Sequence, residues 1–115
     1  MNKELNMHLV STGYPPKQVY IIWTVPHNSI TDYEVYRNGV LIASTAMGSK
    51  FESPTIFDSD HHTNLFRKMS IHKLMFIDED VQAYQHYTYK VVAKRVIEGF
   101  TFEEIPSNDG VIEAL

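Results

Sequence analysis

The sequence predicts an all-β fold, a sandwich of two antiparallel sheets. Two runs of alternating apolar residues, at 19–23 and 87–93, carry this prediction, because side chains at every second position of a strand share one face. Between them, Asn38-Gly39 marks a hairpin, since both residues tolerate the positive φ of a type I′ turn. Strands with one apolar face bury it by packing sheet against sheet. The alternating residues expected in that core are Val19, Ile21, Trp23, Tyr33, Val35, Tyr87, Tyr89 and Val91.

The first half of the chain is expected to hold four strands. One lies near residues 7–10, and the next covers 19–23 and stops at Val25-Pro26, because proline has no N–H to give to a strand ladder. A polar loop at 27–29 leads to a strand whose alternation begins at Tyr33. After the Asn38-Gly39 turn the chain returns along residues 40–43.

Two more strands are expected in the second half. Residues 76–81 are predicted to form a short strand that runs into an acidic turn. Residues 87–93 form a half-buried strand with Lys90 and Lys94 on the solvent side.

These pieces, in this order, resemble a fibronectin type III domain. The resemblance implies an immunoglobulin-like sandwich of about seven strands in a single domain, residues 1–115. The sequence of residues 30–39 resembles that of bacterial and phage copies of the domain. A last strand that begins near Pro106 and includes Val111 is implied only by the family resemblance that these segments show together. The resemblance also implies that Tyr87 is the corner tyrosine, whose hydroxyl bonds to upstream backbone. Fold alone specifies no activity. The matching segments are residues 19–26, 30–39, 76–78, 81–93 and 106–111.

Residues 46–74 depart from the family pattern as an insertion before the family's strand E, the strand that residues 76–78 resemble. A structureless loop of this length would be unusual in a compact domain. An extra hairpin is favoured, with arms at 51–57 and 65–71 and a turn at 58–63, where Asp and Ser side chains can bond nearby backbone. A short helix that begins at Asn64 is the alternative, because Asn caps helices; the apolar period is too short to decide.

Composition excludes several classes of protein. The chain has 115 residues, enough to bury a core without covalent cross-links. Since it has no cysteine, disulfides, Cys-ligated zinc and thiol catalysis are excluded. A net charge of −4 argues against nucleic-acid binding. No apolar run approaches the ~20 residues of a membrane span, and the N-terminus lacks a signal-peptide core. The chain is therefore expected to be cytoplasmic as written, or part of a virion or larger secreted protein.

Residues 58–62 form the one cluster with metal-ligand chemistry. An EF-hand that began at Asp58 would need Gly and Glu where Thr63 and Met69 stand. Adjacent histidines on a strand also point to opposite faces. The cluster is interpreted as the polar turn of the inserted hairpin, and no metal or other cofactor is expected. Its weak candidate ligands are Asp58, Asp60, His61 and His62.

Catalysis is not expected. The sequence contains no Gly-x-Ser-x-Gly nucleophile elbow. It also has no glycine-rich phosphate-binding loop. The prediction is that the protein is not an enzyme.

The aromatic content indicates interaction instead. Seven Tyr, six Phe and one Trp exceed what one small core requires. Those in the insertion or near the last strand, such as Phe51, Phe100 and Phe102, either pack beneath the insertion or form an apolar surface of the kind that marks interaction sites. The candidate interaction residues are Tyr20, Ile22, Tyr36, Phe57, Phe66, Arg67, Lys68 and Lys73.

The expected function is therefore a non-catalytic structural or protein-interaction module. It would be a domain or subunit of a larger bacterial or phage assembly, with a protein partner or a second copy as ligand. One alternative is a carbohydrate-binding accessory module. Another is a metal-dependent binder that uses residues 58–62.

Overall fold

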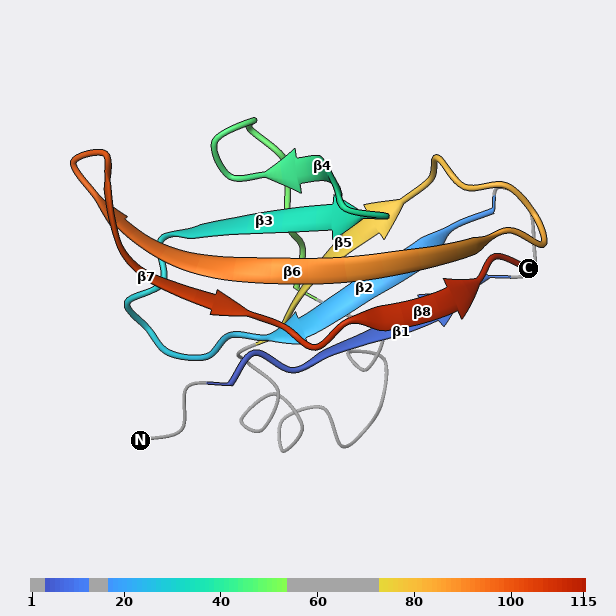
Figure 1. The fold of residues 1–115 in the computed structure, drawn as a ribbon, viewed down its shortest axis with the longest axis horizontal. Helices are drawn as coiled ribbons and strands as arrows, with labels where there is room; N and C mark the ends of the chain where they lie inside the picture. The colour runs from blue at the N-terminus through green and yellow to red at the C-terminus, as the bar shows by residue number, and fades with distance from the viewer. Residues whose placement is uncertain (1–3, 13–16, 54–72) are drawn as a thin grey trace.

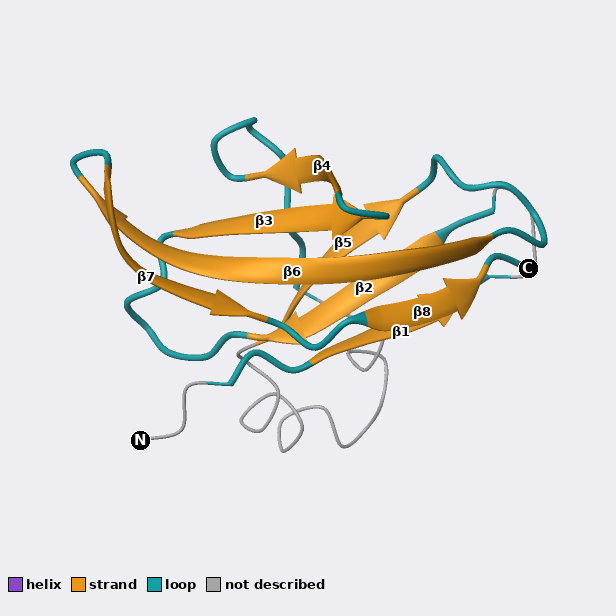
Figure 2. Ribbon diagram, viewed as in Figure 1, coloured by secondary structure: helices purple, strands orange, loops and turns teal. Residues whose placement is uncertain are grey.

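A computed structural model describes residues 4–12, 17–53 and 73–115 of the chain, and the regular structure in these ranges is entirely β-strand (Figure 2). The all-β prediction is confirmed. Eight strands form two antiparallel sheets, one ordered β1-β2-β5 and the other β4-β3-β6-β7 with β8 beside β6 (Figure 1). The strands are β1 Met7–Ser11, β2 Val19–Thr24, β3 Asp32–Arg37, β4 Val40–Ser44, β5 Lys73–Asp78, β6 His86–Ile97, β7 Phe100–Pro106 and β8 Gly110–Glu113.

The two sheets face each other across the predicted core. Seven of its eight predicted residues are buried, and Tyr87 is half-buried and packs against them. Trp23 lies at the centre. Its ring is 5.4 Å from that of Tyr33 and 5.5 Å from that of Phe51, centroid to centroid. The Trp23 indole N–H has no hydrogen-bond partner among the described residues, so its ring stabilises the fold through packing.

Phe51 belongs to the core although it lies in the inserted stretch. Its ring also packs edge-on against Phe76 of β5, 6.2 Å away, and Glu52 forms an isolated antiparallel bridge with Met75. The start of the insertion is therefore part of the sandwich. The rest of the predicted hairpin or helix, including Phe57, lies outside the described residues.

The Asn38-Gly39 turn between β3 and β4 is confirmed. The φ values of these residues are 51° and 79°, the left-handed region that a type I′ turn requires. The Asn38 side chain also accepts a hydrogen bond from the Thr88 N–H at 2.9 Å. It thereby joins the turn to β6, the long central strand of the five-stranded sheet.

A polar joint connects the sheets at one end. Asp78, at the end of β5, is buried. Its carboxylate accepts hydrogen bonds from Arg37 Nη1 of β3 at 2.9 and 3.0 Å and from the Tyr89 hydroxyl of β6 at 2.6 Å. Burial raises the pKa of Tyr89, and its bond to Asp78 raises it further. Burial, the largest single effect, would lower the pKa of Arg37, but the bond to Asp78 and the negative charges of Asp78 and Asp80 together outweigh it, so that pKa is raised.

Several predicted boundaries differ. β5 begins at Lys73 rather than Phe76, so the insertion ends earlier than residue 74. The number of strands is eight rather than about seven, because the chain after β6 forms two strands. β7 pairs with residues 92–97 of β6, and β8 pairs with residues 86–89. Between them, Asn108 exchanges two hydrogen bonds with the Met7 backbone and so fastens this edge to β1.

The outer edges of the five-stranded sheet are irregular. In β4, Ile42 is an extra residue between the partners of Tyr36 and Val35. In β7, Phe102 is an extra residue between the partners of Val96 and Arg95. Bulges of this kind protect sheets from edge-to-edge pairing. Contacts with other molecules are therefore expected through side chains rather than through an added strand.

Candidate functional site

The structure places four of the eight predicted interaction residues. Tyr20, Tyr36 and Lys73 are half-buried, on the outer faces of β2, β3 and β5 respectively. Ile22 is only 5% exposed, so its predicted place on an interaction surface is wrong. Outside the described residues lie Phe57, Phe66, Arg67 and Lys68, together with the metal candidates Asp58, Asp60, His61 and His62.

Ile22 lies on the middle strand of the three-stranded sheet and is flanked from both sides. It lies opposite His8 of β1 and Met75 of β5, and Met75 is buried as well. Burial, together with the nearby charge of Lys73, lowers the pKa of His8. An off-phase apolar residue in a central strand is therefore enclosed here rather than displayed.

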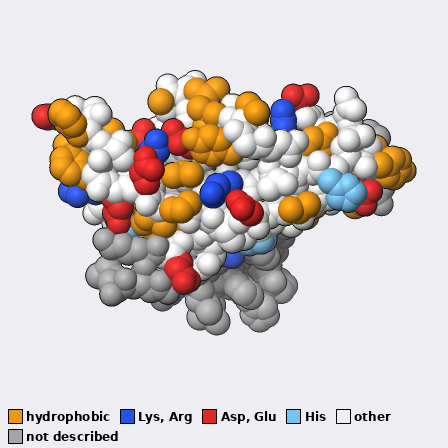
Figure 3. All heavy atoms as spheres, in the orientation of Figure 1, with side chains coloured by type: hydrophobic (Ala, Val, Ile, Leu, Met, Phe, Trp, Pro, Cys, Tyr) orange, Lys and Arg blue, Asp and Glu red, His pale blue; other side chains and the backbone are white. Residues whose placement is uncertain are grey.

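Exposed apolar side chains gather at the hairpin that joins β6 and β7. Ile97, Phe100 and Phe102 are 41%, 71% and 62% exposed. They surround a two-residue turn in which Glu98 and Gly99 have φ values of 50° and 84°. The hairpin extends beyond the start of β3 (Figure 1), and hydrophobic side chains are visible at that end of the molecule (Figure 3). We call Ile97–Phe102 the hairpin tip.

The base of the hairpin is fixed to the loop that precedes β3. The Thr31 hydroxyl accepts a hydrogen bond from the Val96 N–H at 2.8 Å. His27 Nε2 lies 2.8 Å from a Glu103 carboxylate oxygen, and His27 Nδ1 accepts from the Ser29 N–H. Because Nδ1 accepts from Ser29, Nε2 is the ring nitrogen that can donate to Glu103. These contacts hold the hairpin in place from both of its strands.

The bulge sets the position of Phe102. Because Phe102 is the extra residue opposite β6, it leaves the regular alternation of β7. The Arg95 guanidinium lies 5.6 Å from its ring centroid, a separation at which a cation is attracted to the ring face. Arg95 thus supports Phe102 from one side while the side chain as a whole stays largely exposed.

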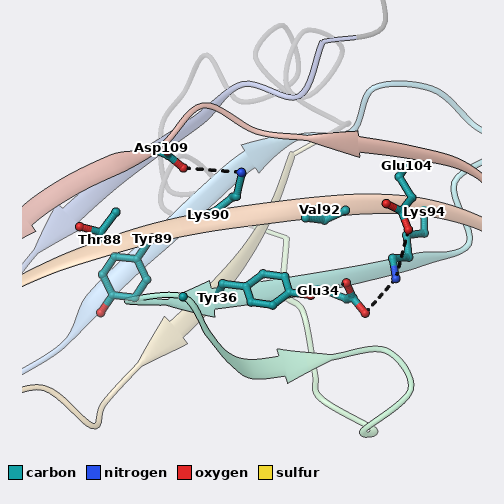
Figure 4. Close-up of a pocket in the computed structure, with 10 residues that line it drawn as sticks. Glu34, Tyr36, Thr88, Tyr89, Lys90, Val92, Lys94, Glu104 and Asp109 are labelled. Atoms are coloured by element: carbon teal, nitrogen blue, oxygen red, sulfur yellow. Dashed lines mark hydrogen bonds and ion pairs between the residues drawn. The ribbon is translucent and has the colours of Figure 1, made fainter.

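A second feature is a shallow groove of about 420 Å³ on the outer face of the five-stranded sheet (Figure 4). Val92 forms part of its floor, and Tyr36 lines one side. The Tyr36 hydroxyl donates to Glu34 at 2.8 Å, and this bond is the main reason that the pKa of Tyr36 is raised. Ion pairs lie at both ends of the groove. At one end, Lys94 lies 3.1 Å from Glu34 and 3.6 Å from Glu104. At the other end, Lys90 lies 3.9 Å from Asp109.

Among the described residues, no group of three or more His, Cys, Asp or Glu side chains could hold a metal ion. The part of the chain that the structure describes also contains no helix long and apolar enough to cross a membrane. Asp78, Arg37 and Tyr89 are joined by hydrogen bonds to one another. Asp78 and Arg37 also contact Asp80. This arrangement joins the two sheets.

The sequence named Phe100 and Phe102 but left open whether they pack beneath the insertion or form an apolar surface; the structure exposes both. The hairpin turn at Glu98-Gly99 was missed. Gly99 between two apolar runs was its one sequence signal, and Glu is not among the residues that favour the first position of a type I′ turn. The groove could not be predicted, because it depends on side chains from β3, β6, β7 and the segment before β8.

Comparisons with protein-family models, with curated proteins and with solved structures give no match to this chain. Its function must therefore be argued from the geometry of the hairpin tip and the groove.

Proposed function

We propose that this chain is a fibronectin type III-like module that acts without catalysis, by binding another protein through the hairpin tip. The observation that carries the proposal is the display of Ile97, Phe100 and Phe102 on a fixed two-residue turn. Phenylalanine is among the residues that are enriched at protein–protein interfaces. Because the turn is held from both strands, little conformational freedom would be lost on binding.

Two features support the family assignment. The first, second and fifth strands share one sheet, and the remaining strands share the other, which is the division that immunoglobulin-like sandwiches use. The Tyr87 hydroxyl accepts a hydrogen bond of 2.8 Å from the N–H of Gln82, five residues upstream. A corner tyrosine makes a bond of this kind to upstream backbone.

The chemistry of the tip favours a protein over a lipid surface. Glu98 lies at its apex and is exposed, and the whole chain carries a charge of −4. Cell membranes present anionic lipids on their cytoplasmic leaflet, which attract basic rather than acidic segments. An apolar cleft in a protein would accept both phenylalanine rings. In this role the chain would serve as a domain or subunit of a larger bacterial or phage assembly.

The test is a double variant, Phe100→Ser with Phe102→Ser. Val111→Ser is the matched control, because Val111 is exposed to a similar degree, at 67%, but lies on β8. Light scattering would measure the mass of each protein, and immobilised protein would be used to retrieve partners from its source cells. Surface substitutions of this kind should change stability by less than about 0.5 kcal/mol, so all three proteins should stay folded.

The proposal predicts that the double variant alone loses its oligomeric mass or its retrieved partner. If the double variant kept the same oligomeric mass and retrieved the same partner as the wild type, the proposal would be contradicted. Loss in the Val111 control but not in the double variant would place the binding surface on β8 instead.

A further inference from the structure

The groove on the outer face of the five-stranded sheet has a different character from the hairpin tip. It is amphipathic rather than apolar, and each of its charged residues has an opposite charge nearby. We infer that this groove is a binding site for a neutral oligosaccharide chain. The inference goes beyond the proposed function, because it concerns a different surface and a different class of ligand.

Tyr36 supplies the aromatic surface that a sugar ring requires. On β3 it alternates with the core residue Val35, so its ring lies on the solvent face. Its hydroxyl is held by Glu34, and Lys90 lies directly opposite on β6. The ring is therefore already oriented before a ligand arrives. The apolar face of a pyranose ring packs on an aromatic ring by the same burial of apolar area that drives other contacts.

Val92 creates the depression beside that ring. It lies opposite Glu34 in the sheet register, between Lys90 and Lys94 along β6. A short side chain between two long ones leaves a hollow. The two lysines are four residues apart, which places their backbones about 13 Å apart at the usual rise of a strand. A short oligosaccharide could therefore reach both ion-paired ends while it covers Val92.

The two ends offer fixed donors and acceptors for hydroxyl groups. At one end, Lys94 lies between Glu34 and Glu104; at the other, Lys90 pairs with Asp109. Hydrogen bonds from hydroxyl groups to charged side chains are stronger than those between neutral groups. The bond and charge of Glu34 raise the pKa of Lys94, so the ammonium donor persists across the physiological pH range.

The balance of charge in the groove selects against other ligands. Three carboxylates face two ammonium groups, so the groove is slightly acidic. A nucleic acid would be repelled, because phosphate binding requires an excess of positive charge. A charged peptide would have to break ion pairs that already exist. A neutral polyol can bond to these groups without separating them.

The test is a titration of the isotope-labelled protein, followed by NMR chemical shifts of its backbone amides. The probes are the neutral hexasaccharides of cellulose, xylan, mannan and chitin, each added to about 10 mM, which is enough to detect binding of millimolar affinity. The expected result is saturable shifts with at least one probe, centred on Tyr36, Lys90, Val92 and Lys94. No saturable shift with any of the four probes would overturn the inference.

Variants then locate the site. Tyr36→Ala should weaken binding at least about tenfold, a loss of about 1.4 kcal/mol, whereas Tyr36→Phe keeps the ring and should lose less. Val92→Lys should block the groove while it keeps Tyr36 and the ion-paired groups, and it carries the test if Tyr36→Ala fails to fold. Val111→Ala, on the same sheet outside the groove, should bind as the wild type does.

Unchanged affinity in both Tyr36→Ala and Val92→Lys would contradict the inference. Shifts centred on the hairpin tip, and abolished by the Phe100→Ser, Phe102→Ser double variant, would also contradict it, because they would assign the sugar to the other surface. Failure of protein binding at the tip would leave the sugar titration unaffected, so the two proposals are tested separately.

Discussion

Replacement of Asp78 by alanine should be among the most destabilising single changes in this protein. The carboxylate lies between the sheets, where it is 5% exposed and accepts from Arg37 and Tyr89 as well as from the Asp80 N–H at 3.1 Å. Its removal would leave the Tyr89 hydroxyl buried without an acceptor and the Arg37 guanidinium without its main partner. Breaking a buried pair in this way costs about 3–5 kcal/mol.

Asp78→Ala should lower the free energy of unfolding by about 3 kcal/mol, the lower end of this range. Arg37 is 21% exposed and keeps a second contact, with Asp80 at 3.4 Å. Urea unfolding would measure this loss of stability. With a denaturant slope of about 1.5 kcal/mol per molar, the midpoint should fall by about 2 M. Tyr89→Phe removes only the 2.6 Å bond to the carboxylate and should cost about 1.5–3 kcal/mol, the usual range for a hydrogen bond to a charged group.

The matched control is Asp80→Ala. Its carboxylate is 92% exposed, and exposed ion pairs contribute about 0–1 kcal/mol, so this change should leave the midpoint nearly unmoved. If Asp78→Ala were as stable as Asp80→Ala, the joint between the sheets would contribute nothing and the reasoning would be refuted. A double-mutant cycle of Asp78→Ala with Tyr89→Phe should show strong coupling, because both changes remove the same bond.

Three further predictions concern the core. Trp23→Ala should cost about 3–5 kcal/mol, and an unchanged melting temperature would mean that Trp23 is not central. Tyr87→Phe should lose about 0.5–1.5 kcal/mol with its bond to Gln82, and equal stability of the two proteins in urea would exclude that bond. Burial raises the pKa of Tyr33 to about 12, against a smaller opposing effect of Trp23. Because the unfolded tyrosine ionises near pH 10, stability should be complete below that pH and fall between about 10 and 12, and Tyr33→Phe should remove this part of the decline.

The sandwich could be predicted where local pattern and burial agree. Val19, Ile21 and Trp23 alternate in sequence and face the core together, and Asn38-Gly39 forms the turn that its residue types favour. The same reasoning failed for Ile22, because alternation tells which face a side chain occupies but not whether that face is open. It also placed the start of β5 too late, since Lys73 and Leu74 pair with β2 without a local signal.

The candidate surfaces depend on contacts that are distant in sequence. Thr31 and Val96, whose bond fixes the hairpin, are separated by 65 positions. Asp109 meets Lys90 only because β8 follows β7 along the same edge of β6. The display of Phe100 and Phe102 depends on a turn that contains Glu98 in a left-handed conformation, which residue preferences disfavour. Sequence could therefore name these aromatic residues but not their exposure.

The central claim, that the hairpin tip binds a protein, is tested most directly by site-specific cross-linking. A photoreactive phenylalanine analogue would replace Phe100 in one protein and Val111 in another, and both would be irradiated in cells of the natural source. The expected result is one adduct of defined mass from position 100, either a second copy of the chain or one partner protein, and none from position 111. Adducts from position 111 alone, or none from either position, would contradict the claim.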